Sequence, residues 1–327
     1  MKIAAVQMVS SPEWAHNRDT AARLVAQAAA AGAQLVALPE YFCLLGRRDT
    51  DKLALAEDPG RGPIQQFLAD TARAHGIWLV GGTLPVKAAA AAGAQLVALP
   101  EYFCLLGRRD TDKLALAEAP GRGPIQDFLA DTALRHGVWL VGGTLPVHAD
   151  VPGRVLNRCA VYGPDGRAAG HYDKVHLFAF DNGRESYDEG RTLCAGGEPV
   201  AVQAGALRVG LSVCYDLRFP ELYRALMRPP CDLLVVPSAF THTTGQAHWE
   251  VLLRARAIEN QCYVLAPAQG GTHENGRRTW GHSLLIDPWG VVVDVLPEGE
   301  GFVIGEVEAQ RLAQVRLQLP ALAHRRL

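Results

Sequence analysis

The chain contains the same 61-residue segment twice in succession, and this repeat limits what the chain can fold into. Residues 28–88 and 89–149 differ at only six positions, and residues 28–57 and 89–118 are identical. Two copies are too few for a solenoid, which needs at least three stacked repeats with distinct ends. Removing one 61-residue copy from the 327 residues leaves 266, a length that suits one compact domain. We therefore expect a single domain over residues 1–327, with either 28–88 or 89–149 as a redundant insert.

Composition and charge are those of an ordinary globular protein. Apolar residues make up 49% of the chain and charged residues 20%, and the net charge is −2. No block of Lys and Arg indicates binding to nucleic acid or to a membrane surface. The N-terminal MKIAAVQMVSS lacks the features of a signal peptide, and no apolar run approaches the roughly 18 residues of a membrane span. We expect a cytoplasmic protein with no nucleic-acid or membrane partner.

The seven cysteines are scattered, and no two of them have CxxC spacing. This pattern argues against a disulfide framework and against a zinc site, so most of the thiols are expected to be reduced and partly buried. The chain also lacks a GxGxxG or GxxxxGK[ST] loop. Neither a metal nor an organic cofactor is therefore expected.

Apolar strand-like runs alternate with amphipathic helical patterns, which predicts an α/β fold. Several strand pairs joined by tight turns, such as Gly163–Gly166, indicate a mixed sheet rather than a purely parallel one. Helices are predicted at 20–34, led by Asn17–Asp19, and at 64–76, 220–227 and 248–261. Strands are predicted at 2–8, 35–40, 77–86, 154–162, 168–178, 199–205, 206–216, 231–240, 262–269 and 283–296, the last with a Pro-Trp-Gly turn, and residues 179–198 are predicted to be a polar loop.

Three segments place an ionisable residue at the end of an apolar strand, where ligands bind in α/β folds. Cys214 precedes a sharp polar turn in RVGLSVCYDLRFPELYR, which would present its thiol as a nucleophile beside backbone N–H groups. Lys174 in GHYDKVHLF could stabilise an anion. Glu40 and Glu101 each end a copy of LVALPE. The structural alternatives are a buried strand cysteine, an outward-facing lysine and an ordinary strand-end carboxylate.

In their order along the chain, LPEYF, YDKVHLF and SVCYDLRFPELYR resemble the nitrilase (carbon–nitrogen hydrolase) superfamily. The resemblance spans the chain apart from one repeat copy, and it implies a four-layer αββα sandwich that pairs into a homodimer. It also implies a Glu–Lys–Cys triad that works without a metal or a cofactor. By motif match the base falls equally on Glu40 and Glu101, the lysine on Lys174, the nucleophile on Cys214, and an assisting glutamate on Glu189 in EGRTLCAG, with Glu185 as the alternative.

Within the superfamily, the segments look most like the Nit branch, whose members include deaminated glutathione amidase and ω-amidase. This resemblance implies hydrolysis of a terminal carboxamide in a small carboxylate-bearing substrate, with ammonia released through a cysteine thioester. Arg218 is the candidate partner for the substrate carboxylate, and an ion pair with Asp216 or Glu221 is its alternative role. The predicted substrate-binding residues are Tyr41, Tyr102, Tyr215, Arg218 and Ser238.

Two other functional readings stay open: hydrolysis of N-carbamoyl amino acids, and an inactive or engineered scaffold in which the duplication blocks the pocket. Copy 1 is preferred for the strand after the first helix, because it carries the whole helix and leaves the ribosome first. A flexible 61-residue excursion of the other copy costs about 3–4 kcal/mol of closure entropy. That copy is expected to be poorly ordered, docked on the surface or swapped into a neighbouring molecule.

Overall fold

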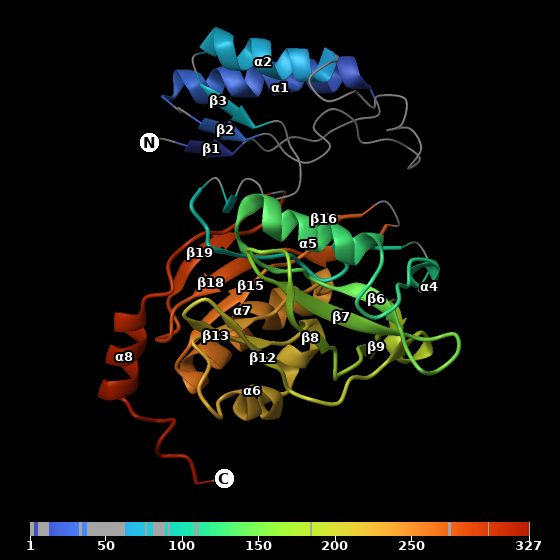
Figure 1. Cartoon of the computed structure of the whole chain (residues 1–327), viewed down its shortest axis with the longest axis vertical. Coiled ribbons are helices and arrows are strands. Elements are labelled where there is room, and N and C mark those ends of the chain that lie inside the picture. Colours follow the sequence, from blue (N-terminus) through green and yellow to red (C-terminus); the bar gives the residue numbers. More distant parts are fainter. Residues whose placement is uncertain are drawn as a thin grey trace. The chain divides into compact units, whose positions relative to one another are not determined.

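The structure is a computed structural model of the chain, and it describes residues 3–5, 13–32, 35–37, 63–75, 77–80, 89–90, 92–107, 109, 111–183, 185–273, 276–299 and 301–326. The chain divides into two compact units, Met1–Ala88 and Ala89–Leu327 (Figure 1). The division falls at the boundary between the two repeat copies, so each unit contains one copy. That one copy is redundant within a single domain stays a prediction.

The first unit is a three-stranded parallel sheet with two helices. The strands lie in the order β1-β2-β3, and the helices contact each other as well as the sheet (Figure 1). Ala21 and Val25 are fully buried on the inner face of the first helix, as its Ala-rich amphipathic pattern predicts. The elements are β1 (Ile3–Ala5), α1 (Trp14–Ala30), β2 (Leu35–Ala37), α2 (Pro63–His75) and β3 (Trp78–Val80).

The second unit begins with a six-stranded mixed sheet centred on its longest strand. This strand, β7 (Val155–Tyr162), pairs with β5, β6, β8 and β11, and β4 completes the sheet beside β5. Helix α5 packs on β5 and β7. The remaining elements are β4 (Leu96–Ala98), α4 (Asp112–Ala115), α5 (Pro124–His136), β5 (Trp139–Val141), β6 (Leu145–His148), β8 (Ala168–Asp173) and β11 (Leu193–Cys194).

A second six-stranded sheet of this unit has the order β12-β13-β14-β15-β18-β19. Helix α7 packs against β15 and β18, and α6 packs against α7. The elements are β12 (Ala201–Ala204), β13 (Leu207–Leu211), α6 (Pro220–Leu226), β14 (Leu233–Val235), α7 (His242–Asn260), β15 (Tyr263–Ala266), β18 (Ser283–Ile286), β19 (Val292–Leu296) and α8 (Ala309–Gln318). Two short ribbons, β9 (Ala179–Asp181) with β10 (Ser186–Asp188) and β16 (Gly270–Thr272) with β17 (Arg278–Trp280), lie beside two 3-10 turns, η2 (Glu189–Arg191) and η3 (Cys214–Arg218).

The two sheets of the second unit share one apolar core. Cys159, Val161 and Tyr172 from the first sheet and Val209 and Leu211 from the second are fully buried in the same cluster. Strand β8 contacts β12 across the interface between the sheets. With helices on the outer face of each sheet, the layers are helix, sheet, sheet and helix. The predicted αββα sandwich is confirmed.

Three predicted boundaries are wrong. Helix α1 begins at Trp14, so Asn17–Asp19 lie inside the helix rather than before it. Helix α7 begins at His242 and not at residue 248, because the Thr241 side chain caps it by accepting a hydrogen bond from the backbone N–H of Thr244. The predicted polar loop at 179–198 contains β9, β10, η2 and β11.

Both repeat copies form their own parallel strand pair in the same register. Leu35 pairs with Trp78 in the first unit, and Leu96 pairs with Trp139 in the second, each partner 61 residues further along. In the first unit β1 pairs with β2 on the side away from β3, with Ile3 opposite Leu35. Among the described strands, β4 has a neighbour on one side only, because it ends its sheet. The preference for copy 1 therefore holds for the strand that follows the first helix.

We predict that a variant lacking residues 28–88 folds as a 266-residue protein. The deletion leaves the sequence of β1, α1 and the following strand unchanged, because residues 89–118 repeat residues 28–57. Ile3 can then pair with Leu96 in the register that it has with Leu35. Circular dichroism should show a single cooperative thermal transition at or above that of the full chain. The matched control lacks residues 89–149 and differs from this variant at only six positions. Failure of the variant lacking residues 28–88 to fold would contradict the prediction.

Candidate active site

Cys214 lies on a strained turn that follows β13. The chain leaves the strand through Ser212 and Val213 and enters η3 at Cys214, which has a φ of +48°. This left-handed conformation is uncommon for residues other than glycine, and it is frequently found where a side chain must be presented to a ligand. The Cys214 backbone N–H donates to the Pro237 carbonyl at 2.9 Å, which fixes the turn to the neighbouring strand end. Cys214 is thus placed on a sharp turn at the sheet rim, as the sequence predicts.

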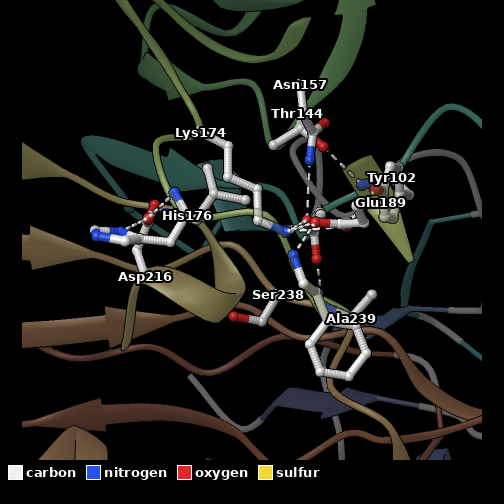
Figure 2. A network of polar contacts seen from close by, with 12 residues as sticks. Tyr102, Thr144, Asn157, Lys174, His176, Glu189, Asp216, Ser238 and Ala239 are labelled. Carbon is white, nitrogen blue, oxygen red and sulfur yellow. Dashed lines mark hydrogen bonds and ion pairs between the residues drawn. The ribbon is translucent and has the colours of Figure 1, made fainter. Parts of the chain in front are cut away.

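Lys174 follows β8 and is fully buried between two carboxylates. Its Nζ donates to Glu101 Oε1 at 3.0 Å and to Glu189 Oε1 and Oε2 at 3.0 and 2.8 Å. Figure 2 shows the Lys174 side chain extended toward Glu189, with Tyr102 on the far side of that carboxylate. A buried ammonium is stable only when opposite charges and hydrogen bonds replace its hydration. The two glutamates meet that requirement.

Glu101, at the end of β4, is the repeat-copy acid that meets Lys174. Its side chain is 1% exposed and also accepts hydrogen bonds from Asn157 Nδ2 and from the Ala239 backbone N–H, both at 3.0 Å. Gly143 lets the chain pass close to this point, because a Cβ there would lie 2.1 Å from the Pro100 carbonyl oxygen.

The acid near Lys174 therefore comes from copy 2, and the preference for copy 1 does not extend to this position. Two of the predicted site residues, Glu40 and Tyr41, lie outside the described residues.

Glu189 is the second carboxylate, supplied by η2. Besides Lys174, its side chain accepts hydrogen bonds from the Tyr102 hydroxyl at 2.8 Å and from the Phe178 backbone N–H at 2.7 Å. The alternative acid, Glu185, instead accepts a hydrogen bond from the Thr243 hydroxyl at 3.1 Å. Glu189 rather than Glu185 therefore joins Lys174.

Cys214, Glu101, Lys174 and Glu189 form one set, called here the buried cluster. Burial raises the pKa of the Cys214 thiol, as does the Glu101 charge, while Lys174 acts in the opposite direction. Burial alone would lower the pKa of Lys174, but the charges of Glu101 and Glu189 outweigh burial and raise it. Burial alone would raise the pKa of Glu189, and the Lys174 ammonium with its hydrogen bonds outweighs burial and lowers it. Lys174 is thus held protonated and Glu189 ionised.

A second polar network joins the Lys174 segment to the turn that carries Cys214. The buried Asp216 carboxylate accepts hydrogen bonds from the Tyr172 hydroxyl at 2.7 Å and from the Val213 backbone N–H at 2.8 Å. It also accepts from the His176 backbone N–H at 3.0 Å and contacts His176 Nδ1 at 2.7 Å (Figure 2). Tyr172 and His176 flank Lys174 by two residues on either side. Asp216 therefore fixes the distance between the lysine and the nucleophile.

A pocket of about 300 Å³, called here the inner pocket, opens onto the buried cluster. Three of the predicted substrate-binding residues, Tyr102, Tyr215 and Arg218, line this pocket. Ser238 does not, because its hydroxyl is buried and donates to the Val236 carbonyl at 3.0 Å. Ser238 is therefore not a pocket residue. The two residues that follow it, Ala239 and Phe240, form the pocket wall at this point.

Arg218 lies between aromatic rings at the edge of the inner pocket. Its guanidinium carbon is 5.8 Å from the Tyr215 ring centroid and 5.3 Å from that of Phe240. Asp216, one of its two suggested partners, is committed to Tyr172, His176 and Val213. In the part of the chain that the structure describes, no carboxylate forms an ion pair with Arg218. The guanidinium contacts His248 Nδ1 at 3.2 Å, and its positive charge can still attract an anionic ligand because no acidic group of the described residues neutralises it.

Sequence reasoning missed several residues that complete the site. Asn157 was detectable, because it lies in phase with the buried Val155 and Cys159 along an otherwise apolar strand face. Asp216 was noted only as a possible partner of Arg218. No sequence signal identifies the Ala239 N–H, because a backbone donor does not depend on the type of side chain at that position. Within the described ranges, no group of three or more His, Cys, Asp or Glu side chains could hold a metal ion.

We predict that Asp216→Asn destabilises the fold and weakens the site. Asparagine replaces one acceptor oxygen with an NH₂ donor, which faces other donors at this position. The free energy of unfolding should fall by about 2–3 kcal/mol in urea titrations, with a loss of Cys214 alkylation rate. Tyr172→Phe removes one hydrogen bond to the same carboxylate and the one that the Tyr172 hydroxyl accepts from the Val175 backbone N–H at 3.2 Å, and it should cost about 1–2 kcal/mol. An Asp216→Asn variant as stable as the wild type would contradict the role given to this network.

The ion pair of Glu189 predicts a pH dependence of stability. Because the pKa of Glu189 is lower in the folded chain than in the unfolded chain, its contribution is complete above the unfolded value of about 4.3. This contribution to stability is lost as the pH falls through the pKa of Glu189 in the folded chain. The difference in unfolding free energy between wild type and Glu189→Gln should therefore be constant near neutrality and shrink below about pH 4.3. Urea titrations from pH 7 to pH 3 measure it, with Glu185→Gln as the matched control. A difference that stays constant throughout would rule out the ion pair.

Comparison with known proteins agrees with this geometry. The carbon-nitrogen hydrolase family model matches residues 2–87 and again residues 85–317, one match for each unit. A deaminated glutathione amidase of Synechocystis is 46% identical over 237 residues, covering 71% of this chain and 86% of that protein. The ω-amidase NIT2 of Danio rerio is 38% identical over 242 residues, covering 74% and 86%.

The fold also has solved counterparts. Nit3 of Saccharomyces cerevisiae, a member of the nitrilase superfamily, is similar in structure with a TM-score of 0.58 at 24% identity, covering 100% of this chain and 97% of that one. The sandwich, the buried cluster and the sequence matches together lead to one conclusion: the chain belongs to the carbon-nitrogen hydrolase family.

Proposed function

We propose that the chain is an amidase that hydrolyses the carboxamide of a small carboxylate-bearing substrate through a thioester on Cys214. The observation that carries the proposal is the buried cluster, in which a thiol and two carboxylates line one pocket and an ammonium pairs with both carboxylates. The relatives from Synechocystis and Danio rerio, a deaminated glutathione amidase and an ω-amidase, support the same class of reaction.

In the first half of the reaction, Glu101 takes the proton of Cys214, since the thiolate is the reactive form of cysteine. This transfer moves a proton within the buried cluster and leaves the net charge of its four side chains, Lys174, Glu101, Glu189 and Cys214, unchanged at −1. The thiolate attacks the amide carbon, and a C–S bond forms. The Lys174 ammonium and the Tyr215 backbone N–H stabilise the negative charge that develops on the carbonyl oxygen.

The C–N bond then breaks, and the Glu101 carboxyl returns the proton to the departing amine. A thioester remains on Cys214. In the second half, the Glu101 carboxylate deprotonates a water molecule, which attacks the thioester carbon and releases the carboxylic acid. The proton returns to Cys214, so the net reaction consumes one amide and one water. Glu189 acts as a positioning residue, because it holds Lys174 and Tyr102 in place.

The substrate carboxylate is assigned to Arg218. A guanidinium that stacks on aromatic rings and lines the pocket of the nucleophile is suited to bidentate recognition of a carboxylate. Hydrolysis of an N-carbamoyl amino acid uses the same groups and is distinguished by assay with a carbamoyl amino acid. The homodimer and the cytoplasmic location stay predictions. No helix of the described residues is long and apolar enough to cross a membrane.

The two repeat copies offer a matched pair of variants for testing the proposed base. Glu101→Gln should lower kcat for deaminated glutathione or α-ketoglutaramate by about 10²–10⁴-fold, because the general base is lost. Glu40→Gln, which changes the same residue in the same local sequence, should leave kcat within about twofold, since Glu101 is the acid that meets Lys174. Product release is measured for both substrates.

Cys214→Ala is the background control and should have no activity, whereas an active Cys214→Ala variant would overturn the mechanism. Full activity in both glutamate variants would mean that the two copies substitute for each other. That result would contradict the assignment of the base to Glu101 alone.

A further inference from the structure

The half-buried guanidinium of Arg218 contacts three ring systems at the edge of the inner pocket. Two of them are the rings of Tyr215 and Phe240, whose centroids lie 5.8 and 5.3 Å from the guanidinium carbon. The third is His248, whose Nδ1 lies 3.2 Å from Arg218 Nη1. A charge over a ring face has no fixed hydrogen-bond direction, so His248 is the contact that orients the N–H groups of Arg218.

The hydrogen bond between Arg218 and His248 can run in only one direction. A guanidinium has five N–H donors, has no acceptor and keeps its proton in proteins, so Arg218 donates and His248 Nδ1 accepts. A ring nitrogen that accepts carries no proton, and the contact therefore requires the neutral imidazole, with its N–H on Nε2. His248 thus gives the guanidinium a direction without adding a charge.

A neutral acceptor affects Arg218 differently from a carboxylate. An acid at the place of His248 would form an ion pair with the guanidinium, and such pairs are frequently bidentate, so both the charge and two N–H groups would be engaged. The imidazole engages one N–H group and no charge. Since no acid of the described residues pairs with Arg218, the positive charge persists at the edge of the inner pocket.

Helix α7 also holds the main chain beside Arg218. The Leu217 carbonyl accepts hydrogen bonds from Nε and Nη2 of the buried Arg256 at 3.1 and 3.0 Å. Arg256 and His248 lie on the same helix, about two turns apart. One helix therefore fixes the backbone of the η3 turn through Arg256 and the side chain of Arg218 through His248.

The first turns of α7 hold His248 next to the inner pocket but outside it. Thr244, one turn earlier on the same helix face, lines the inner pocket. Trp249, the residue after His248, is buried, and its Nε1 donates to the His282 carbonyl at 2.7 Å. His248 is exposed and is not among the residues that line the inner pocket. It therefore acts on a substrate through Arg218 and not by direct contact.

Resting on the proposed function, we propose that His248 is a positioning residue that aims the Arg218 guanidinium at the substrate carboxylate and leaves its charge intact. The site thereby selects amides with an anionic acyl portion over neutral amides of the same length. The effect falls on KM rather than on kcat, because the carboxylate makes the same contact in the ground state and in the transition state.

The test compares α-ketoglutaramate with its methyl ester, which has the same amide and no carboxylate. His248→Asn keeps a neutral acceptor, because the amide oxygen of asparagine takes about the place of the histidine Nδ1. His248→Leu removes the acceptor, and His248→Asp replaces it with a charged one. Gln246→Leu is the matched control, since it makes a polar-to-apolar change at another exposed position of α7. Thermal unfolding checks that each variant is folded.

His248→Leu should raise KM for α-ketoglutaramate about 2–10-fold, the range of one hydrogen bond, with kcat within about twofold. His248→Asn should restore KM to within about twofold of the wild type. His248→Asp should raise KM about 10–100-fold, because an ion pair then neutralises the guanidinium. The methyl ester should be poor for the wild type, and its KM should stay within about twofold in every variant. Gln246→Leu should match the wild type on both substrates.

Equal rises in KM for the acid and the ester in His248→Leu would overturn the inference, because the loss would then be structural. A His248→Asn variant as poor as His248→Leu, or a His248→Leu variant equal to the wild type, would overturn it as well. A wild-type chain that hydrolyses the acid and the ester equally well would overturn the assignment of the carboxylate to Arg218, and this inference with it. A wild-type chain that hydrolyses neither would instead overturn the proposed function itself.

Discussion

The pairing of the buried Lys174 with the carboxylates of Glu101 and Glu189 is the interaction on which the site depends. An ammonium with no exposed surface loses its hydration, and the effective cost is several kcal/mol per ion unless charges and hydrogen bonds replace the water. Glu101 and Glu189 replace it from two separate segments, the end of β4 and η2. The Ala239 N–H and Asn157 then hold Glu101 from the second sheet and from β7. The ion pair is thus also the point at which both sheets converge.

The contacts of Glu101 depend on its environment and not on its local sequence alone. Glu40 and Glu101 lie within identical stretches of 30 residues, and the strands before them pair in the same register with their own copies. Glu101 differs in following a strand whose sheet also contains β7 and β8, which supply Asn157 and lead into Lys174. A strand end becomes part of the buried cluster when its neighbours bring the complementary charge.

Much of the fold and most of the buried cluster could be predicted from the sequence. Strand periodicity located most strands of the two sheets, although β11 lay in a predicted loop. The order of three motifs pointed to Lys174 and Cys214 through the family resemblance, and the segment EGRTLCAG pointed to Glu189 in the same way. The choice between Glu40 and Glu101 could not be predicted, because identical sequences carry no information about which copy contacts Lys174. Ser238 was misplaced because alternation along a strand end does not show where the pocket wall begins. Asp216 was underestimated because its partners lie 40 and 44 residues away along the chain.

The central claim is that the buried cluster activates one thiol among seven. Its most direct test is the site-resolved alkylation rate of all seven cysteines in the native protein, measured by iodoacetamide labelling and peptide mass spectrometry at neutral pH. Cys214 should react well ahead of the other six, because it lines a pocket beside a proton acceptor and a fixed ammonium. Its reaction should slow in Glu101→Gln. A Cys214 that reacts no faster than the fully buried Cys159 and Cys262 would contradict the claim.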